Sequence, residues 1–172
     1  MGYELSEQFD WCLPNVIVYP TGGGTGLIGM WKAFKELEEL GWIDAKKSRI
    51  VTVQATGCAS IVQAFNERKK VSEFWTDAQT IASGLHVPKA FADTLILNVL
   101  YESGGTVIAV TDQELLHDMK HTASVEGISL CPEGAAAIAA TRKLVKCGIV
   151  NNTEKVVILN TGTGYKYIEL FT

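Results

Sequence analysis

Short apolar runs rich in β-branched residues alternate along this chain with segments of helical periodicity. Between the runs, apolar residues recur at spacings of three and four, as they do on one face of a helix. Each run is bounded by Gly, Pro, Asn or Thr and has the length of a buried strand. Strands are therefore expected at residues 16–19, 50–53, 106–110 and 156–159, with a weaker one at 128–130.

The repeated order of strand, helix and strand constrains the fold. It predicts a three-layer α/β domain in which helices cover both faces of a mainly parallel sheet. An amphipathic pattern at residues 4–11 predicts a helix before the first strand, and residues 69–87 are expected to form a long loop. Thr111, followed by acids, predicts a capped helix start. The remaining helices are expected at about residues 26–40, 59–68, 90–101, 112–127 and 133–148.

Length and charge narrow the classes of protein and partner. The chain has 172 residues, 47% of them apolar, and a net charge of −4. That length supports one domain with its own core over residues 1–172. No basic stripe is present to neutralise phosphates, so nucleic acid is not an expected partner. No apolar run approaches ~20 residues, and acids occupy the positions where a signal peptide would be basic, so a cytoplasmic protein is expected.

The cysteines stand far apart in the sequence. No CxxC pair exists and no histidine clusters beside a cysteine, so neither a metal site nor a disulfide framework is predicted. Buried or half-buried free thiols in a reducing compartment are the expectation. The positions concerned are Cys12, Cys58, Cys131 and Cys147.

The most specific feature lies between the first expected strand and the helix that follows. Residues 21–26 are Thr-Gly-Gly-Gly-Thr-Gly, with four glycines in the five positions from Gly22. Each glycine costs ~0.5–1 kcal/mol in lost backbone freedom, so a turn without a ligand explains them poorly. Backbone N–H groups in such a turn and in the first helical turn form an anion site. Phosphate is the expected occupant.

The kind of phosphate follows from what the sequence lacks. Residues 24–29 match Gly-x-Gly-x-x-Gly, but a dinucleotide fingerprint also needs an acid at the end of the second strand. Gln54 and Thr56 stand there instead. No Gly-Lys-Ser/Thr follows the glycines, which excludes a Walker P-loop. A small phosphorylated ligand without a ribose remains.

A second turn of small residues follows the last expected strand. Residues 160–164 are Asn-Thr-Gly-Thr-Gly, with hydroxyls at Thr161 and Thr163. Both turns should lie at the carboxyl edge of a parallel sheet, where ligands bind in α/β folds. A ligand with a phosphate at one end and a polar ring atom at the other would bridge them.

Several motifs spread over the chain share one resemblance. Read together, they resemble the threonine synthases, pyridoxal-phosphate enzymes of the tryptophan-synthase-β type, also called fold type II. The motifs are Met-Gly-Tyr-Glu from residue 1, Leu-Pro from 13, Tyr-Pro-Thr-Gly-Gly-Gly-Thr-Gly-Leu-Ile-Gly-Met-Trp-Lys-Ala-Phe from 19, Ala-Ser-Gly-Leu from 82, Val-Pro from 87, Pro-Glu-Gly-Ala-Ala from 132 and Asn-Thr-Gly-Thr-Gly from 160.

The resemblance implies a cofactor, a reaction and a set of site residues. The cofactor is pyridoxal 5'-phosphate, and the reaction converts O-phosphohomoserine and water into threonine and phosphate. Thr161 matches the hydroxyl that hydrogen-bonds the pyridine nitrogen. A neutral partner there leaves the ring less electron-poor than a carboxylate would, which suits elimination and replacement at side-chain carbons. The residues matching the loop around the cofactor phosphate are Thr21, Gly22, Gly23, Gly24, Thr25 and Gly26.

Weaker candidates come from the segments around the expected site. Ser83 lies in a segment that approaches the reactive side of the cofactor in relatives. Glu133 is a charged candidate, although an acid in a first helical turn also stabilises the helix dipole. His86 and Lys89 flank the same segment as Ser83 and are candidates for the substrate phosphate.

The lysine that holds the cofactor covalently in the family is not found. It belongs to an N-terminal segment, and none of the twelve lysines of this chain has its context. Residues 1–172 are therefore expected to be the C-terminal cofactor-domain portion of a longer threonine synthase, inactive alone and homodimeric through exposed apolar surface. Another fold-type-II lyase, such as a threonine dehydratase or a cysteate-forming enzyme, and a stand-alone phosphate-ligand binding module remain as alternatives.

Overall fold

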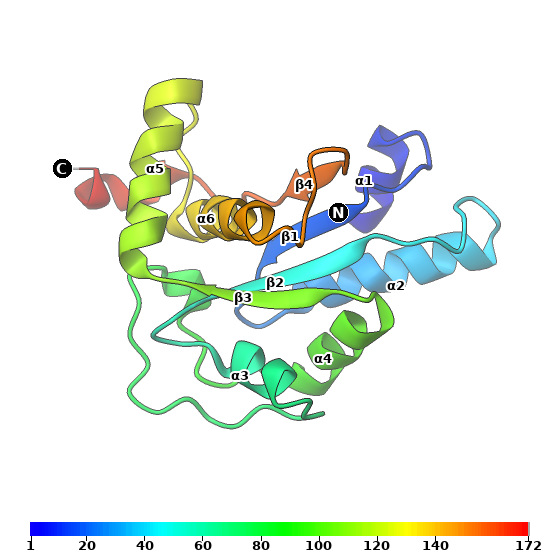
Figure 1. Cartoon of the computed structure of the whole chain (residues 1–172), viewed down its shortest axis with the longest axis horizontal. Helices are drawn as coiled ribbons and strands as arrows, with labels where there is room; N and C mark the ends of the chain where they lie inside the picture. Colours follow the sequence, from blue (N-terminus) through cyan, green and yellow to red (C-terminus); the bar gives the residue numbers. More distant parts are fainter. Residues whose placement is uncertain (172) are drawn as a thin grey trace.

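A computed structural model describes residues 1–171 as helices packed around a central sheet (Figure 1). The strands are β1 Val16–Pro20, β2 Arg49–Ala55, β3 Thr106–Val110 and β4 Val156–Ile158. The α-helices are α1 Gly2–Gln8, α2 Thr25–Glu39, α3 Ser60–Asn66, α4 Asp93–Glu102, α5 Asp112–Glu126 and α6 Pro132–Lys146. Two 3-10 segments, η1 Ser83–Leu85 and η2 Gly164–Leu170, complete the elements.

The sheet is parallel throughout and has the strand order β3-β2-β1-β4. The two central strands are buried almost along their whole length, whereas β3 and β4 at the edges are half-buried. Central strands of a parallel sheet lie between two layers of helices, which explains their continuous apolar sequence. The predicted α/β class is confirmed.

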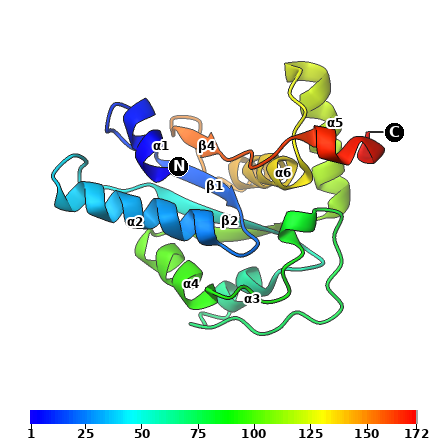
Figure 2. The ribbon, with the colours of Figure 1, turned by 180° about the vertical axis from the view of Figure 1, so that it is seen from behind.

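Two separate cores flank the sheet, and they define the three layers. Val16 and Val18 pack in one core with α5 and α6, whereas Ile17 between them packs in the other with α2, α3 and α4. This alternation is the two-residue period of a strand. Figure 2 shows α2 and α4 on one side of the sheet and α6 on the other.

The helix start predicted at Thr111 is confirmed. Its hydroxyl accepts a hydrogen bond from the Glu114 backbone N–H, and the Glu114 carboxylate accepts one from the Thr111 N–H, which together make a capping box. The same helix ends at Gly127, which adopts the left-handed conformation with φ 68°. Strong local signals of this kind explain why the bounds of α5 agree with the sequence pattern.

The fifth strand expected at residues 128–130 does not form, and that prediction is wrong. Only an isolated antiparallel bridge joins Leu130 to Thr163, and Gly164 N donates to Ser129 O at 2.9 Å. The segment pairs with a neighbouring connection instead of with the sheet. Of its two apolar side chains, Leu130 is buried in the core with residues of α6, whereas Ile128 is exposed.

The expectation for the cysteines is partly corrected. Cys58 and Cys131 are buried, but Cys12 and Cys147 are exposed. All four are free thiols. Within residues 1–171, no helix is both long and apolar enough to span a membrane, and no cluster of three or more His, Cys, Asp or Glu side chains is arranged to bind a metal.

Candidate functional site

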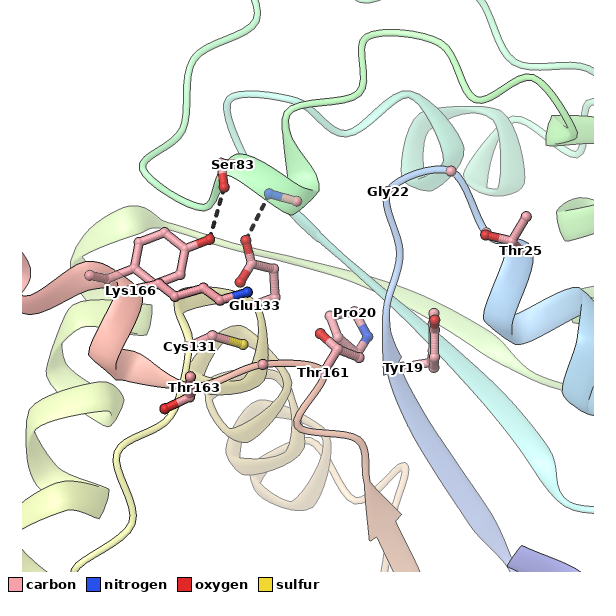
Figure 3. A pocket seen from close by; sticks show the side chains of 15 residues that line it. Tyr19, Pro20, Gly22, Thr25, Ser83, Cys131, Glu133, Thr161, Thr163 and Lys166 are labelled. Carbon is pink, nitrogen blue, oxygen red and sulfur yellow. Dashed lines mark hydrogen bonds between the residues drawn. The ribbon is translucent and has the colours of Figure 1, made fainter. Parts of the chain in front are cut away.

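A cavity of about 310 Å³ opens at the carboxyl edge of the sheet, between the turns that follow β1 and β4 (Figure 3). These two strands are neighbours, but the chain reaches them from opposite faces, so a crevice opens between their ends. The sequence predicted that both turns would meet at this edge, and the structure confirms it. The lining residues are Tyr19, Pro20, Gly22, Gly23, Gly24, Thr25, Ser83, Gly84, Cys131, Glu133, Thr161, Gly162, Thr163, Lys166 and Tyr167.

The glycine turn forms the end of the cavity next to α2. Gly24 is the N-cap of α2 and has φ 79°, a conformation that favours glycine. Gly23 lines the cavity, and a Cβ built on it would meet no atom within 4 Å, so space is open at this position of the turn. The first turn of α2 leaves N–H groups without partners inside the helix. The turn therefore has both the space and the donors that a phosphate needs.

Two of the residues expected in the phosphate loop do not line the cavity. The Thr21 side chain is fully buried, and its hydroxyl lies 3.0 Å from Tyr19 O and 3.2 Å from the Thr52 hydroxyl. Thr21 N also donates to Val53 O. A Cβ at Gly26 would lie 2.1 Å from the hydroxyl of Tyr19, so Gly26 allows that ring to pack closely. Thr21 and Gly26 therefore contribute to the packing of the turn, whereas the other four residues of the expected loop, Gly22 to Thr25, line the cavity.

The turn after β4 is held against the start of α6. A Cβ at Gly134 would lie 2.1 Å from Asn160 Oδ1, and one at Gly162 would lie 3.3 Å from Cys131 Sγ. These two glycines allow the turn to approach the helix closely. Thr161 is thereby presented to the cavity as an exposed hydroxyl. Figure 3 shows it on the opposite side of the cavity from Gly22.

Cys131 places a thiol beside this turn. As the N-cap of α6, its Sγ accepts a hydrogen bond from Gly134 N at 3.3 Å and lies 3.4 Å from Asn160 Oδ1. Burial raises the pKa of the thiol, and the Glu133 carboxylate raises it further, against the opposing effect of the Gly134 N–H. The thiol therefore stays protonated and neutral at physiological pH.

The segment around η1 covers the cavity from above (Figure 3). The Ser83 hydroxyl lies 2.9 Å from the Tyr167 hydroxyl, so the candidate Ser83 is present in the lining and is already hydrogen-bonded. Glu133 is buried, and its Oε1 accepts a hydrogen bond from Gly84 N at 2.7 Å. His86 and Lys89 lie outside the lining, the first against Ala78 O and the second against Ser72 O.

Lys166 and Tyr167 line the cavity although the sequence pattern gave them no role. They belong to η2, which the sequence did not predict. In Figure 3 the amino end of Lys166 points into the cavity beside Glu133. Their position after the predicted Thr161 turn was the one available signal, because residues that follow a carboxyl-edge turn lie close to the same crevice.

Gln54 stands where a dinucleotide site would need an acid, and its side chain has a structural role instead. Its side chain is fully buried. Oε1 accepts hydrogen bonds from Ile61 N at 2.9 Å and Val62 N at 3.1 Å, and Nε2 donates to Thr21 O. One amide thus joins the start of α3 to the glycine turn. An acid at this position would lack the donor for Thr21 O.

Comparisons with known proteins agree with this geometry. Threonine synthases from Methanocaldococcus jannaschii and Methanosarcina acetivorans are 34% and 33% identical over 96% and 94% of this chain. The chain spans about two fifths of their length, 41% and 40%. A solved structure of threonine deaminase isoform 2 from Solanum lycopersicum has the same fold, with a TM-score of 0.75 at 21% identity over 98% of this chain and 47% of that one.

The family comparison is more general and covers most of the sequence. Residues 1–162 match the family described as "Pyridoxal-phosphate dependent enzyme", a stretch that contains both turns of the cavity up to Thr161 and Gly162. The solved structures with this fold are enzymes of the tryptophan-synthase-β-like type, as the sequence resemblance implied. The chain therefore belongs to the family of pyridoxal-phosphate-dependent enzymes.

Proposed function

We propose that this chain supplies the cofactor-binding part of a threonine synthase. In this proposal the turn formed by Gly22, Gly23, Gly24 and Thr25 holds the phosphate of pyridoxal 5'-phosphate. Thr161 donates to or accepts from the pyridine nitrogen. The observation that carries the proposal is that an open glycine turn at a helix start and the exposed Thr161 line one cavity of about 310 Å³. Cavities of this size hold small cofactors.

The residues of the chain bind and orient rather than react. The cofactor, when bound, supplies the electron sink that labilises bonds of an amino-acid substrate. The glycine turn fixes its phosphate through backbone N–H groups and the positive end of the α2 dipole. A neutral hydroxyl at Thr161 and a neutral thiol at Cys131 place no formal charge beside the ring nitrogen. That environment suits elimination and replacement rather than transamination.

The reaction of the whole protein belongs to the same proposal. O-phosphohomoserine and water would be converted to threonine and inorganic phosphate, as the names of the curated relatives suggest. The chain covers about two fifths of those relatives, and no lysine in it has the sequence context of the family's covalent lysine. We therefore expect no release of phosphate from O-phosphohomoserine by residues 1–172 alone.

Binding measurements test the proposed phosphate site. Pyridoxal 5'-phosphate and pyridoxal, which lacks the phosphate, would be titrated against the chain by fluorescence quenching. Gly23→Asp puts a carboxylate into the turn, and Gly29→Asp puts the same group on the exposed outer face of α2, where a Cβ also meets no atom within 4 Å. Charge repulsion in the turn should weaken binding by about tenfold, or ~1.4 kcal/mol, only for Gly23→Asp.

Two outcomes would contradict the site. Equal affinities for pyridoxal 5'-phosphate and pyridoxal would mean that the phosphate is not held by the turn. Equal affinities of the two aspartate variants would place the binding site elsewhere.

Treatment with borohydride, followed by mass spectrometry, shows whether Lys166 in the lining forms an adduct. A single adduct there would argue for an independent active centre in this chain.

The alternative within the fold is a dehydratase acting on threonine. The structural neighbours include threonine deaminases, although at 21% and 18% identity they support only the fold. Assays of the longer protein that carries this chain distinguish the two. Phosphate and threonine from O-phosphohomoserine support the synthase, whereas ammonia and a 2-oxo acid from threonine support the dehydratase.

A further inference from the structure

The long connection between α3 and α4 is fastened by carboxylates from the first turns of three successive helices. Asp93 of α4 accepts hydrogen bonds from Ser72 N and Ser72 Oγ, both at 2.8 Å. Asp112 of α5 accepts from Thr80 Oγ1 at 2.7 Å and Ile81 N at 3.0 Å. Glu133 of α6 accepts from Gly84 N at 2.7 Å. The connection is therefore tied to the body of the molecule at three points.

The third contact differs from the others because it lies at the cavity. Both Glu133 and Gly84 are lining residues, whereas Asp93 and Asp112 are not. A Cβ at Gly84 would lie 2.9 Å from Glu133 Oε1, so the carboxylate sits directly on the Gly84 backbone. Burial of Glu133, which is 7% exposed, shields this hydrogen bond from water.

The carbonyl of Gly84 rests on the glycine turn. A Cβ at Gly22 would lie 2.1 Å from Gly84 O, so the two backbones are in direct contact. Ser83, the residue before Gly84, is held as well, because its hydroxyl lies 2.9 Å from the Tyr167 hydroxyl. The η1 turn is therefore clamped between the first turn of α6 and the glycine turn, as Figure 3 shows for the Gly84 to Glu133 contact.

We propose that Glu133 is a positioning residue that sets the glycine turn in its anion-binding shape through the backbone of Gly84. This inference rests on the proposed function, since it assigns a determinant of the same phosphate site. Without the carboxylate, Gly84 N–H loses its acceptor, and the Gly84 carbonyl is free to move away from Gly22. The glycine turn then loses the surface that supports it from the side of α6.

The charge of Glu133 and its contact with Gly84 predict opposite changes in phosphate affinity when the side chain is removed. A carboxylate that lines an anion site repels the anion, so removing its charge should strengthen phosphate binding if repulsion were its main effect. If Glu133 instead positions the turn, removing its acceptor should weaken binding. The sign of the change therefore separates the two roles.

The experiment uses residues 1–172 with three substitutions. Glu133→Ala removes the acceptor, Glu133→Gln removes the charge but keeps an acceptor oxygen, and Asp112→Ala unties the connection outside the cavity. Inorganic phosphate affinity would be measured by titration calorimetry. Amide hydrogen exchange would be followed for peptides covering residues 21–26 and 82–85, with thermal unfolding as a check of the fold.

The expected result is a pattern across the three variants. Glu133→Ala should weaken phosphate binding by about fivefold or more and speed exchange in both peptides. Glu133→Gln and Asp112→Ala should stay within about twofold of the parent in phosphate affinity. Unchanged or tighter binding by Glu133→Ala, or equal losses in the Ala and Gln variants, would overturn the positioning role.

A failure of the proposed phosphate site would give a different result from a failure of the positioning role of Glu133. If the parent chain binds no phosphate, the proposed phosphate site is wrong. The exchange data then decide the inference by themselves: faster exchange at residues 21–26 in Glu133→Ala alone supports the clamp. Parent-like exchange there would overturn it.

Discussion

At the scale of single residues, the site depends on side chains that connect backbones as much as on those facing the ligand. Gln54 is the clearest case, because one buried amide serves both the start of α3 and Thr21 O. In the sequence, Gln54 was informative only because a dinucleotide site would need an acid in this place. Its partners come from residues seven, eight and 33 positions away, and pattern alone does not identify such contacts.

Replacement of Gln54 by Ala should destabilise the fold strongly. Two N–H groups at the start of α3 and one carbonyl of the glycine turn would lose their partners, at ~1–3 kcal/mol for each buried group left unsatisfied. We expect the free energy of unfolding to fall by about 3 kcal/mol or more in urea denaturation. Gln63→Ala, which changes an exposed glutamine of α3, is the matched control and should change it by less than about 0.5 kcal/mol.

Thiol reactivity offers a second residue-level test. Cys12 and Cys147 are exposed, whereas Cys58 and Cys131 are buried and burial raises the pKa of both of their thiols. The thiolate is the reactive form, so iodoacetamide should modify the first pair quickly and the second pair slowly at neutral pH. Peptide mass spectrometry over a time course measures this. Rapid labelling of Cys131 would contradict the packing of the Thr161 turn.

At the scale of elements, sequence and structure agree where the signal is local. Runs of β-branched residues gave the four strands of the sheet, and the capping box gave the start of α5. The segment at residues 128–130 failed because its partner, the 163–164 connection, lies far along the chain. For the same reason η2, with Lys166 and Tyr167 in the lining, could not be predicted.

Acids at helix starts link stability to pH. Burial alone would raise the pKa of Asp93, but hydrogen bonds from Ser72 and Thr94 and the charge of Lys89 outweigh it, so the pKa lies below its ordinary value of 3.8. A depressed pKa in the folded state contributes stability above the unfolded pKa, and this contribution is lost as the pH falls through the folded value. Asp93 should therefore stabilise the fold near neutral pH and less so in acid.

Urea denaturation at several pH values tests this link. The free energy of unfolding of the parent should fall as the pH is lowered below about 4. Asp93→Asn should be less stable than the parent at neutral pH and should lose less on acidification. Parallel pH profiles for the two proteins would show that Asp93 does not contribute to the acid sensitivity.

At the scale of the whole molecule, the exposed apolar side chains suggest self-association. Leu95 of α4 is 52% exposed and borders a groove with α2, and Phe91 just before α4 is fully exposed. Apolar surface of this kind is usually covered in an assembly. We expect a dimer in sedimentation velocity at high micromolar concentration, weakened by Leu95→Glu. A monomer under those conditions would contradict the prediction.

In the proposed function, one cavity holds both ends of the cofactor. A crystal structure of the chain grown with pyridoxal 5'-phosphate tests it most directly. We predict the phosphate against the backbone of Gly22 to Thr25 and the pyridine nitrogen within hydrogen-bond distance of the Thr161 hydroxyl. A cofactor bound with its phosphate at Lys166, or outside this cavity, would contradict the account.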